Sequence, residues 1–369
     1  MADKLRVAVL FGGRSGEHDV SLMSARSVLD ALRRDRYEIL EVGITKEGVW
    51  LMGEGVWQAL KEGRTEGLTP VTILPDPTRP GLYAFRDGGL ERVARVDVVF
   101  PVLHGTFGED GTLQGLLEMA DLAYVGAGVV GSAVGMDKGV FKAVMEAHFL
   151  PVVAYLVLTR REVEEQLDEV VTRCEALAPY PLFVKPANLG SSVGVTKADN
   201  RDELVAGLEL AARYDRRIVV ERGVPNAREI EVSVLGNEEP QASVPGEIRP
   251  GDEFYSYEAK YLDDSSELII PARLSKEEAE RVRALAVAAY KACDLAGMAR
   301  VDFLLDPESG EFFINEVNTI PGFTQISMYP KLWEASGLPY PDLLDRLIDL
   351  ALTRKAERDR TVRTYRPGE

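Results

Sequence analysis

The segment that most restricts the fold of this chain is residues 298–322, MARVDFLLDPESGEFFINEVNTIPG. Two apolar runs, Val301–Leu305 and Phe312–Val317, flank the sequence DPESG. Proline, glycine, aspartate and serine together between two apolar runs are typical of a tight turn. The segment is therefore predicted to form a β-hairpin.

The polar side chains of this hairpin are expected on one face. Because side chains alternate along a strand, Arg300 and Asp302 share a face, and so do Glu316 and Asn318. If Asp302 lies opposite Glu316, then Arg300 lies opposite Asn318, and all four polar groups gather together. The other face, expected to pack into a core, then carries Val301, Phe303, Leu305, Phe313 and Val317.

Two carboxylates that face each other indicate a bound cation. Asp302 and Glu316 repel each other unless a positive charge lies between them. With the carbonyl of Asn318 they form a set of hard oxygen ligands, which favours Mg²⁺ completed by substrate phosphates. The alternative is a solvated polar face on an edge hairpin, although these strands are otherwise very apolar.

Composition narrows the class of protein. A chain of 369 residues is expected to form two or three domains. A net charge of −17 argues against nucleic acid or an anionic membrane as partner, so an anionic nucleotide would need local lysines, arginines and Mg²⁺. Two cysteines and three histidines, without a Cys/His cluster, exclude a disulfide framework and argue against structural zinc. No signal peptide or membrane span is evident, so a cytoplasmic protein is expected.

The N-terminal part is predicted to be a doubly wound α/β domain. Leu5–Phe11 is typical of a buried parallel strand, and a glycine-rich loop and a helix follow it. The glycines do not have the G-x-G-x-x-G spacing of dinucleotide-binding loops. Glu17 in this loop is either a charge at a helix N-terminus or a group that binds a substrate ammonium. His104, in a second glycine-rich loop after a strand, is either a ligand or incidental.

Residues 181–194, PLFVKPANLGSSVG, are predicted to bind phosphate. An apolar strand delivers Lys185 to a Gly/Ser loop whose amides and hydroxyls can hold phosphate oxygens. Further on, Glu229 is either a surface charge or a ribose contact. It precedes residues 230–235, whose polar and apolar alternation predicts a sheet with one open face. The irregular, polar stretch 251–267 is predicted to be a mobile lid.

The order of the motifs resembles that of a known superfamily. From residue 11 to about 330 they are FGGRSGEHDVS, LHGTFGEDG, MDK, LFVKPANLGSSVG, REIEV, FYSYEAKY, ARVDF and NEVNTIPGFT. The chain resembles the ATP-grasp superfamily and, through GGRSGEHDVS together with EAKY, the D-alanine–D-alanine ligase family. The resemblance implies an α/β ATP-grasp fold of three subdomains, the first a doubly wound pre-ATP-grasp domain. It implies a substrate domain over 1–127, a central subdomain over 128–224, and a C-terminal subdomain with the metal and substrate sites over 225–369.

The resemblance also implies a reaction and its residues. Two D-alanines would be joined through an acyl phosphate, with release of ADP and phosphate, to supply peptidoglycan synthesis; ATP and two Mg²⁺ (or Mn²⁺) are implied. The implied catalytic residues are Glu17, Ser191, Tyr261, Arg300 and Gly322. The implied ATP-binding residues are Lys138, Lys185, Ser192, Glu221, Val224, Glu229 and Lys260. The implied substrate contacts are Glu17, His104, Ser327 and Met328, and the implied metal ligands are Asp302, Glu316 and Asn318. Arg222 departs from the lysine that the family often has there.

Three alternatives stay open at this point. A D-alanine–D-lactate ligase would share the scaffold, but a residue without a hydroxyl at position 261 favours the ester product, and Tyr261 favours the amide. A Rossmann-type oxidoreductase would need the missing G-x-G-x-x-G. A non-catalytic nucleotide-binding regulator would have gaps in the metal triad, which is complete. The oligomeric state is not determined by the sequence, and a homodimer is one alternative.

Overall fold

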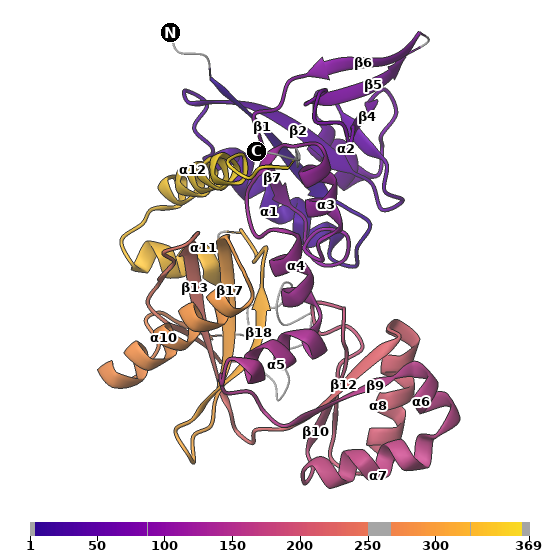
Figure 1. The fold of residues 1–369 in the computed structure, drawn as a ribbon, viewed down its shortest axis with the longest axis vertical. Coiled ribbons are helices and arrows are strands. Elements are labelled where there is room, and N and C mark those ends of the chain that lie inside the picture. Colours follow the sequence, from indigo (N-terminus) through magenta and orange to yellow (C-terminus); the bar gives the residue numbers. More distant parts are fainter. Residues whose placement is uncertain (1–3, 87, 250–266, 325, 364–369) are drawn as a thin grey trace, which may run out of the picture.

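The computed structural model describes residues 4–86, 88–249, 267–324 and 326–363. The described strands form three sheets, which follow one another along the chain (Figure 1). Within these ranges, no helix combines the length and the apolarity that crossing a bilayer requires.

The first sheet has eight strands in the order β6-β5-β4-β3-β2-β1-β7-β8. Strands β2, β1, β7 and β8, which make up one half of the sheet, are parallel, as expected of a doubly wound domain. The remaining strands add an antiparallel extension that the sequence did not indicate. The strands are β1 (Leu5–Gly12), β2 (Tyr37–Ile44), β3 (Trp50–Met52), β4 (Thr69–Ile73), β5 (Leu82–Arg86), β6 (Gly89–Ala94), β7 (Val98–Val102) and β8 (Ala123–Tyr124). The helices of this segment are α1 (His18–Ala31), α2 (Val56–Glu62) and α3 (Thr112–Met119).

The second sheet is antiparallel and has four strands in the order β11-β10-β12-β9. Its buried side chains, such as Val184 and Ile218, share a core with those of helices α7 and α8. The elements are β9 (Tyr155–Thr159), α6 (Arg160–Glu165), α7 (Leu167–Leu177), β10 (Leu182–Pro186), β11 (Thr196–Ala198), α8 (Arg201–Tyr214) and β12 (Arg217–Arg222).

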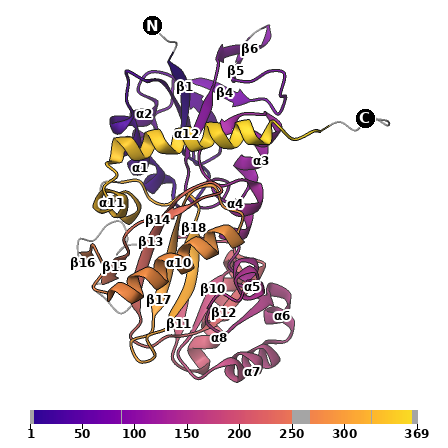
Figure 2. The ribbon, with the colours of Figure 1, turned by 60° about the vertical axis from the view of Figure 1, so that its left-hand side comes forward.

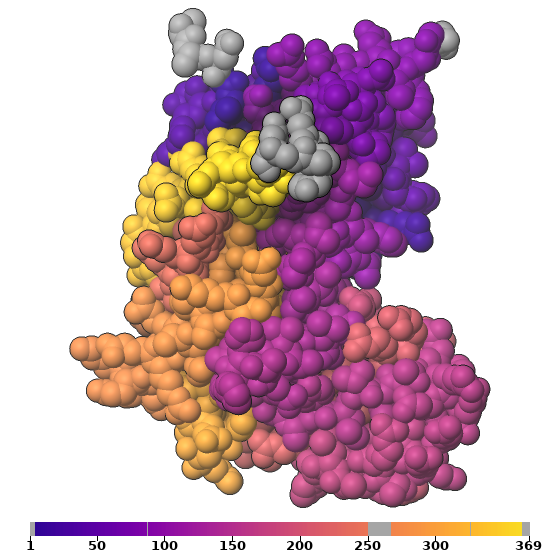
Figure 3. Space-filling view, viewed as in Figure 1, coloured from indigo at the N-terminus to yellow at the C-terminus, as the bar shows by residue number. Residues whose placement is uncertain are grey.

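The third sheet is built around β13 and the β17–β18 hairpin. Helix α5 precedes the second sheet in sequence, yet its Phe141 and Met145 lie in the core of the third. Figure 3 shows the residues around α5 (magenta) between the masses of the third sheet (orange) and the second (pink). The strands are β13 (Arg228–Gly236), β14 (Gln241–Ala242), β15 (Gly246–Arg249), β16 (Glu267–Ile269), β17 (Gly297–Leu305) and β18 (Phe312–Asn318). The helices are α4 (Val129–Met136), α5 (Lys138–Ala147), α10 (Lys276–Ala292), α11 (Met328–Ala335) and α12 (Tyr340–Arg358).

The prediction that one face of β13 (Arg228–Gly236) is open to solvent is wrong. Glu231 and Ser233 are both buried, as is Val232 between them. Helix α11 covers this face, and the Ser233 hydroxyl donates to the Tyr329 carbonyl at 3.3 Å. The alternating pattern therefore reflects buried polar residues, of which Ser233 lies against α11, and not a solvated surface.

The hairpin has the predicted pairing, with one irregularity. Asp302 lies opposite Glu316 and Arg300 opposite Asn318, which confirms the prediction. Beyond Asp302 the register shifts, so that Phe303 lies opposite Ile314 and Asn315 is the extra residue of a β-bulge. Phe312 and Ile314, both fully buried, therefore face the core. Phe313, predicted on the core face, instead stacks with the guanidinium of Arg222, 5.2 Å from its ring centre.

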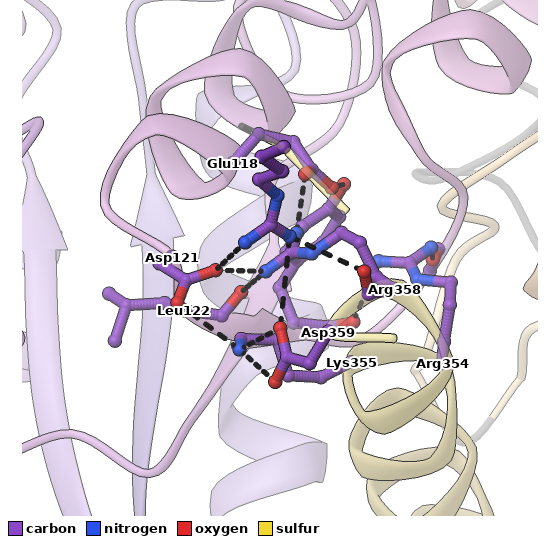
Figure 4. Close-up of polar contacts among 10 residues, drawn as sticks. Glu118, Asp121, Leu122, Arg354, Lys355, Arg358 and Asp359 are labelled. Atoms are coloured by element: carbon purple, nitrogen blue, oxygen red, sulfur yellow. Dashed lines mark hydrogen bonds and ion pairs between the residues drawn. The ribbon is translucent and has the colours of Figure 1, made fainter. Parts of the chain in front are cut away.

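Helix α12 returns to the first sheet and closes the fold. Figure 2 shows it lying across the N-terminal elements. Its apolar residues share a core with β1 and β7. Near its start Asp345 pairs with Arg33 and Arg36, and near its end Arg358 pairs with Glu118 and Asp121 (Figure 4). The predicted subdomain boundaries near residues 127 and 224 fall in connections between sheets. Helices α5 and α12 pack against sheets other than those nearest to them in sequence, so the boundaries stay predictions.

Candidate active site

Two adjoining cavities lie where the three sheets meet. The larger, about 580 Å³, lies between the second and third sheets. The smaller, about 310 Å³, lies between the third sheet and loops of the first. Residues that line both cavities are Lys138, Leu189, Gly190, Ser191, Glu231 and Glu316. A molecule bound in one cavity can therefore reach a molecule bound in the other.

Among the described residues, three lysines line the larger cavity, Lys138, Lys185 and Lys197. Lys185, from β10, is 2.8 Å from Glu221 Oε2 and 3.3 Å from Asn315 Oδ1. Lys138, the first residue of α5, donates to the Leu189 carbonyl at 2.7 Å and lies 3.9 Å from Glu316. This end of the cavity is thus suited to bind anionic oxygens.

Glu221, which the resemblance implies as an ATP-binding residue, has two cationic partners in the structure. It lies at the end of β12, with its side chain 3% exposed, and it is paired with both Lys142 and Lys185. Burial raises the pKa of the Glu221 carboxyl, but the charges of Lys142 and then Lys185 outweigh burial and lower the pKa to about 2. The carboxylate is therefore ionised throughout the physiological range.

The loop that follows β10 has an unusual backbone. Ser191 and Ser192 have φ values of 51° and 57°, a left-handed conformation that residues with a Cβ rarely adopt. Gly194 follows with φ 72°. Such residues persist where function or packing requires them. The loop borders both cavities, and Ser192 lines the larger one together with Val224 and Glu229, two further residues that the resemblance implies for ATP. Phosphate binding by this loop stays a prediction.

Glu17 and Ser191 meet at the smaller cavity. The Ser191 hydroxyl donates to the Glu17 carboxylate, although the two residues are 174 positions apart. Glu17 precedes α1, and its side chain makes no capping hydrogen bond to that helix. Its role as a substrate ligand stays a prediction. Gly105 permits this approach, because a Cβ there would lie 2.3 Å from Glu17 Oε2.

His104 and Glu109 connect the first sheet to the third. His104 is buried, with Nδ1 2.9 Å from the Ile320 carbonyl and Nε2 2.9 Å from the Ser24 hydroxyl. Burial lowers the pKa of His104, which favours a neutral imidazole. Glu109 accepts from the amides of Gly105 at 2.8 Å and Ile320 at 3.1 Å. The sequence analysis missed Glu109, although it lies in the same motif as His104.

The polar face of the hairpin forms a charge network that borders both cavities, with Asp302 in the larger and Arg300 and Asn318 in the smaller. The guanidinium of Arg300 binds both oxygens of Asp302, at 2.7 and 2.6 Å, and lies 3.0 Å from Glu231. The Asn318 amide donates to Asp302 at 2.9 Å. Glu231 was not predicted, because its position was assigned to an open face.

The donor set on this face is compatible with Mg²⁺. The described ranges hold no group of three or more His, Cys, Asp or Glu side chains that could bind a metal ion. The candidate set is instead two carboxylates, Asp302 and Glu316, and the amide of Asn318, which can present oxygen or nitrogen. These hard oxygen donors suit Mg²⁺ when phosphate oxygens complete the coordination.

Ser327 and Gly322 lie at the far end of the smaller cavity. The Ser327 hydroxyl accepts from the Thr324 amide at 3.1 Å, and Ser327 precedes helix α11. A Cβ at Gly322 would lie 2.8 Å from this hydroxyl, so the turn needs glycine there. Met328 is buried against Ile248. Amides at the start of a helix favour a carboxylate ligand.

Two predicted site residues cannot be placed. Lys260 and Tyr261, and the lid predicted over 251–267 except its last residue, lie outside the described residues. The other predicted site residues line one or both cavities.

A mixed sheet followed by two antiparallel ones around a lysine-lined cavity, in a chain whose structural neighbours are D-alanine–D-alanine ligases, is the ATP-grasp architecture, and the fold and site together define an enzyme of the ATP-grasp ligase class. The sequence matches two family models, "D-ala D-ala ligase N-terminus" over residues 6–127 and "D-ala D-ala ligase C-terminus" over residues 144–349. The chain belongs to the D-alanine–D-alanine ligase family.

Similar proteins are named in the same way. A D-alanine–D-alanine ligase of Thermoanaerobacter sp. is 53% identical over 360 residues, covering 97% of this chain and 99% of the relative. One from Heliobacterium modesticaldum is 52% identical over 357 residues, or 97% of each chain. The structure of the D-alanine-D-alanine ligase from Coxiella burnetii matches with a TM-score of 0.81 and 39% identity over 97% of each chain. The VanG D-Ala:D-Ser ligase from Enterococcus faecalis matches with a TM-score of 0.84 and 37% identity, covering 95% of this chain and 100% of that one.

Proposed function

We propose that this enzyme joins two molecules of D-alanine into D-alanyl-D-alanine, with conversion of ATP to ADP and phosphate, in the cytoplasm. The observation that carries the proposal is the shared wall of the two cavities, which includes Lys138, Ser191 and Glu316. A nucleotide in the larger cavity would present its terminal phosphate to a carboxylate held in the smaller one. The names of relatives about 50% identical over nearly the whole chain support the choice of substrates.

In the first step, a carboxylate oxygen of the first D-alanine attacks the γ-phosphorus, and ADP leaves. Lys138 and Lys185 would neutralise the phosphate oxygens, with help from the 190–194 loop. Asp302, Glu316 and Asn318 would hold two Mg²⁺ ions, which supply further charge neutralisation when bound. Glu221 and Val224 would contact adenine, and Glu229 the ribose. The resemblance implies that Lys260 also contacts the phosphates.

In the second step, the amine of the second D-alanine attacks the carbonyl of the acyl phosphate. The C–O bond to phosphate breaks, the phosphate leaves with that oxygen, and the amine loses a proton. Arg300 and the Gly322 amide would stabilise the oxyanion. Glu17 would bind the ammonium of the first substrate. Ser191 holds its carboxylate, and the resemblance implies that Tyr261 also orients it. His104 would lie near the first D-alanine, and Ser327 and Met328 would hold the carboxylate of the second D-alanine.

This sequence of steps is tested by isotope transfer. D-alanine labelled with ¹⁸O in its carboxylate should pass one ¹⁸O atom to the phosphate for each dipeptide formed, because that oxygen bridges carbon and phosphorus in the acyl phosphate. Phosphate without label, formed together with dipeptide, would exclude an acyl phosphate.

D-serine is a second candidate for the acceptor. The observation that favours it is the structural match to the VanG D-Ala:D-Ser ligase. Competition between D-alanine and D-serine at equal concentration, read as the ratio of the two dipeptides, separates these alternatives. We expect mainly D-alanyl-D-alanine.

A further inference from the structure

Lys142 is a buried cation that the proposed mechanism does not use. It lies on α5, four residues after Lys138, so both side chains project from the same side of the helix. Its side chain is fully buried, and it lines neither cavity. Its Nζ lies 3.2 Å from Glu221 Oε1 and 5.8 Å from the ring centre of Tyr155.

The two oxygens of Glu221 have different partners. Oε1 faces Lys142, whereas Oε2 accepts from Lys185 at 2.8 Å. Lys185 lines the larger cavity, with its side chain 12% exposed, so a ligand in that cavity can reach its ammonium. Lys142, enclosed behind Glu221, has no such access. One cation of this buried triad is thus available to a ligand, and the other is fixed.

This arrangement resolves a conflict in charge. If Lys185 moves from Glu221 to a phosphate, a buried carboxylate would lose its counter-charge, and such a loss is strongly unfavourable. Lys142 prevents this because it stays beside Oε1. The oxygen that Lys185 leaves can then accept a hydrogen bond from the nucleotide base.

We propose that Lys142 is a positioning residue for the nucleotide: it keeps Glu221 neutralised and oriented so that Lys185 is free to bind phosphate. The proposal rests on the proposed use of ATP. It assigns Lys142 an effect on nucleotide affinity although the side chain touches no ligand.

The test is a double-mutant cycle on the dissociation constant of ATP, measured by calorimetry without D-alanine. Lys142→Met should weaken ATP binding about tenfold or more, because Lys185 must then neutralise both Glu221 and phosphate. Glu221→Gln should also weaken binding. Adding Lys142→Met to Glu221→Gln should weaken it no further, because no buried carboxylate remains to be neutralised. The KM for D-alanine should not change in Lys142→Met.

Several outcomes would overturn the proposal. Additive losses in the cycle would contradict it, and so would an unchanged ATP dissociation constant in a Lys142→Met protein of lower thermal stability, since that result is typical of packing alone. If Lys142→Met does not fold, the double variant Lys142→Met/Glu221→Gln, which removes the charges of both residues, is compared with Glu221→Gln alone. Weaker ATP binding by the double variant would contradict the proposal. Lys291→Met, an exposed substitution on α10, is the matched control.

Failure of the proposed function would give a different result. A wild-type protein that binds ATP but forms no dipeptide would refute the reaction and leave the cycle interpretable. A wild type that binds ATP and forms dipeptide, with an additive cycle, would refute only the role of Lys142.

Discussion

Glu316 stands in the wall shared by both cavities, opposite Asp302 and 3.9 Å from Lys138. If it binds the metal that accompanies ATP, Glu316→Gln should lower kcat about a hundredfold or more, because charge neutralisation of phosphate is lost. Thermal stability without ligand should be retained, since the substitution also removes repulsion from Asp302. Steady-state turnover and thermal unfolding measure the two effects. Glu311→Gln, exposed in the same hairpin, is the control. Turnover like that of the wild type at limiting Mg²⁺ would rule out Glu316 as a ligand.

Glu109 should give the protein a pH dependence of stability. Burial, and then the charge of Glu17, raise the pKa of Glu109 from 4.5 to about 8. The folded protein therefore holds a proton that the unfolded chain has lost between these values. The stability from this group is fully present below pH 4.5 and is lost as the pH rises toward 8.

Glu109→Gln is neutral at every pH and should flatten this decline. Urea midpoints between about pH 5 and 8 measure it, with Glu311→Gln as the exposed control. An equal slope for the wild type and Glu109→Gln would show that Glu109 is ionised in the folded protein at neutral pH.

At the scale of elements, helix α12 joins the end of the chain to its beginning. The side chain of Asp345, 8% exposed, pairs with Arg33 and Arg36 and accepts from the Tyr37 hydroxyl at 2.7 Å. Asp345→Ala should therefore destabilise the protein by about 2 kcal/mol, because it leaves the buried Tyr37 hydroxyl without its acceptor and removes the ion pairs with Arg33 and Arg36.

Denaturant unfolding measures this loss, and Asp349→Ala, exposed on the same helix, should cost much less. Equal effects of the two substitutions would mean that the ion pairs at Asp345 do not fasten the helix.

The elements also show where sequence reasoning ends. Alternation predicted the pairing of Asp302 with Glu316, but the bulge at Asn315 changes the face of the residues before it. The apolar and polar residues around Asn315 are the same with or without a bulge, so the sequence pattern does not reveal it. The burial of Ser233 involves α11, about a hundred positions later, and no local pattern contains that information.

At the scale of the whole molecule, the order of the motifs predicted the fold and the family, and the comparisons confirm both. The meeting of Glu17 with Ser191 followed from the resemblance and not from spacing, because contacts over 174 positions depend on how sheets pack. Lys142 and Glu109 were missed for the same reason. Their importance lies in burial and in charged neighbours, which only the folded chain provides.

The most direct test of the account is the stoichiometry of the reaction with ATP and D-alanine. We predict equal amounts of ADP, phosphate and D-alanyl-D-alanine, and little phosphate release with L-alanine or without an amino acid. D-lactate should be a poor acceptor beside D-alanine, as Tyr261 indicates. ATP hydrolysis that does not depend on D-alanine, or phosphate release without dipeptide, would contradict the account.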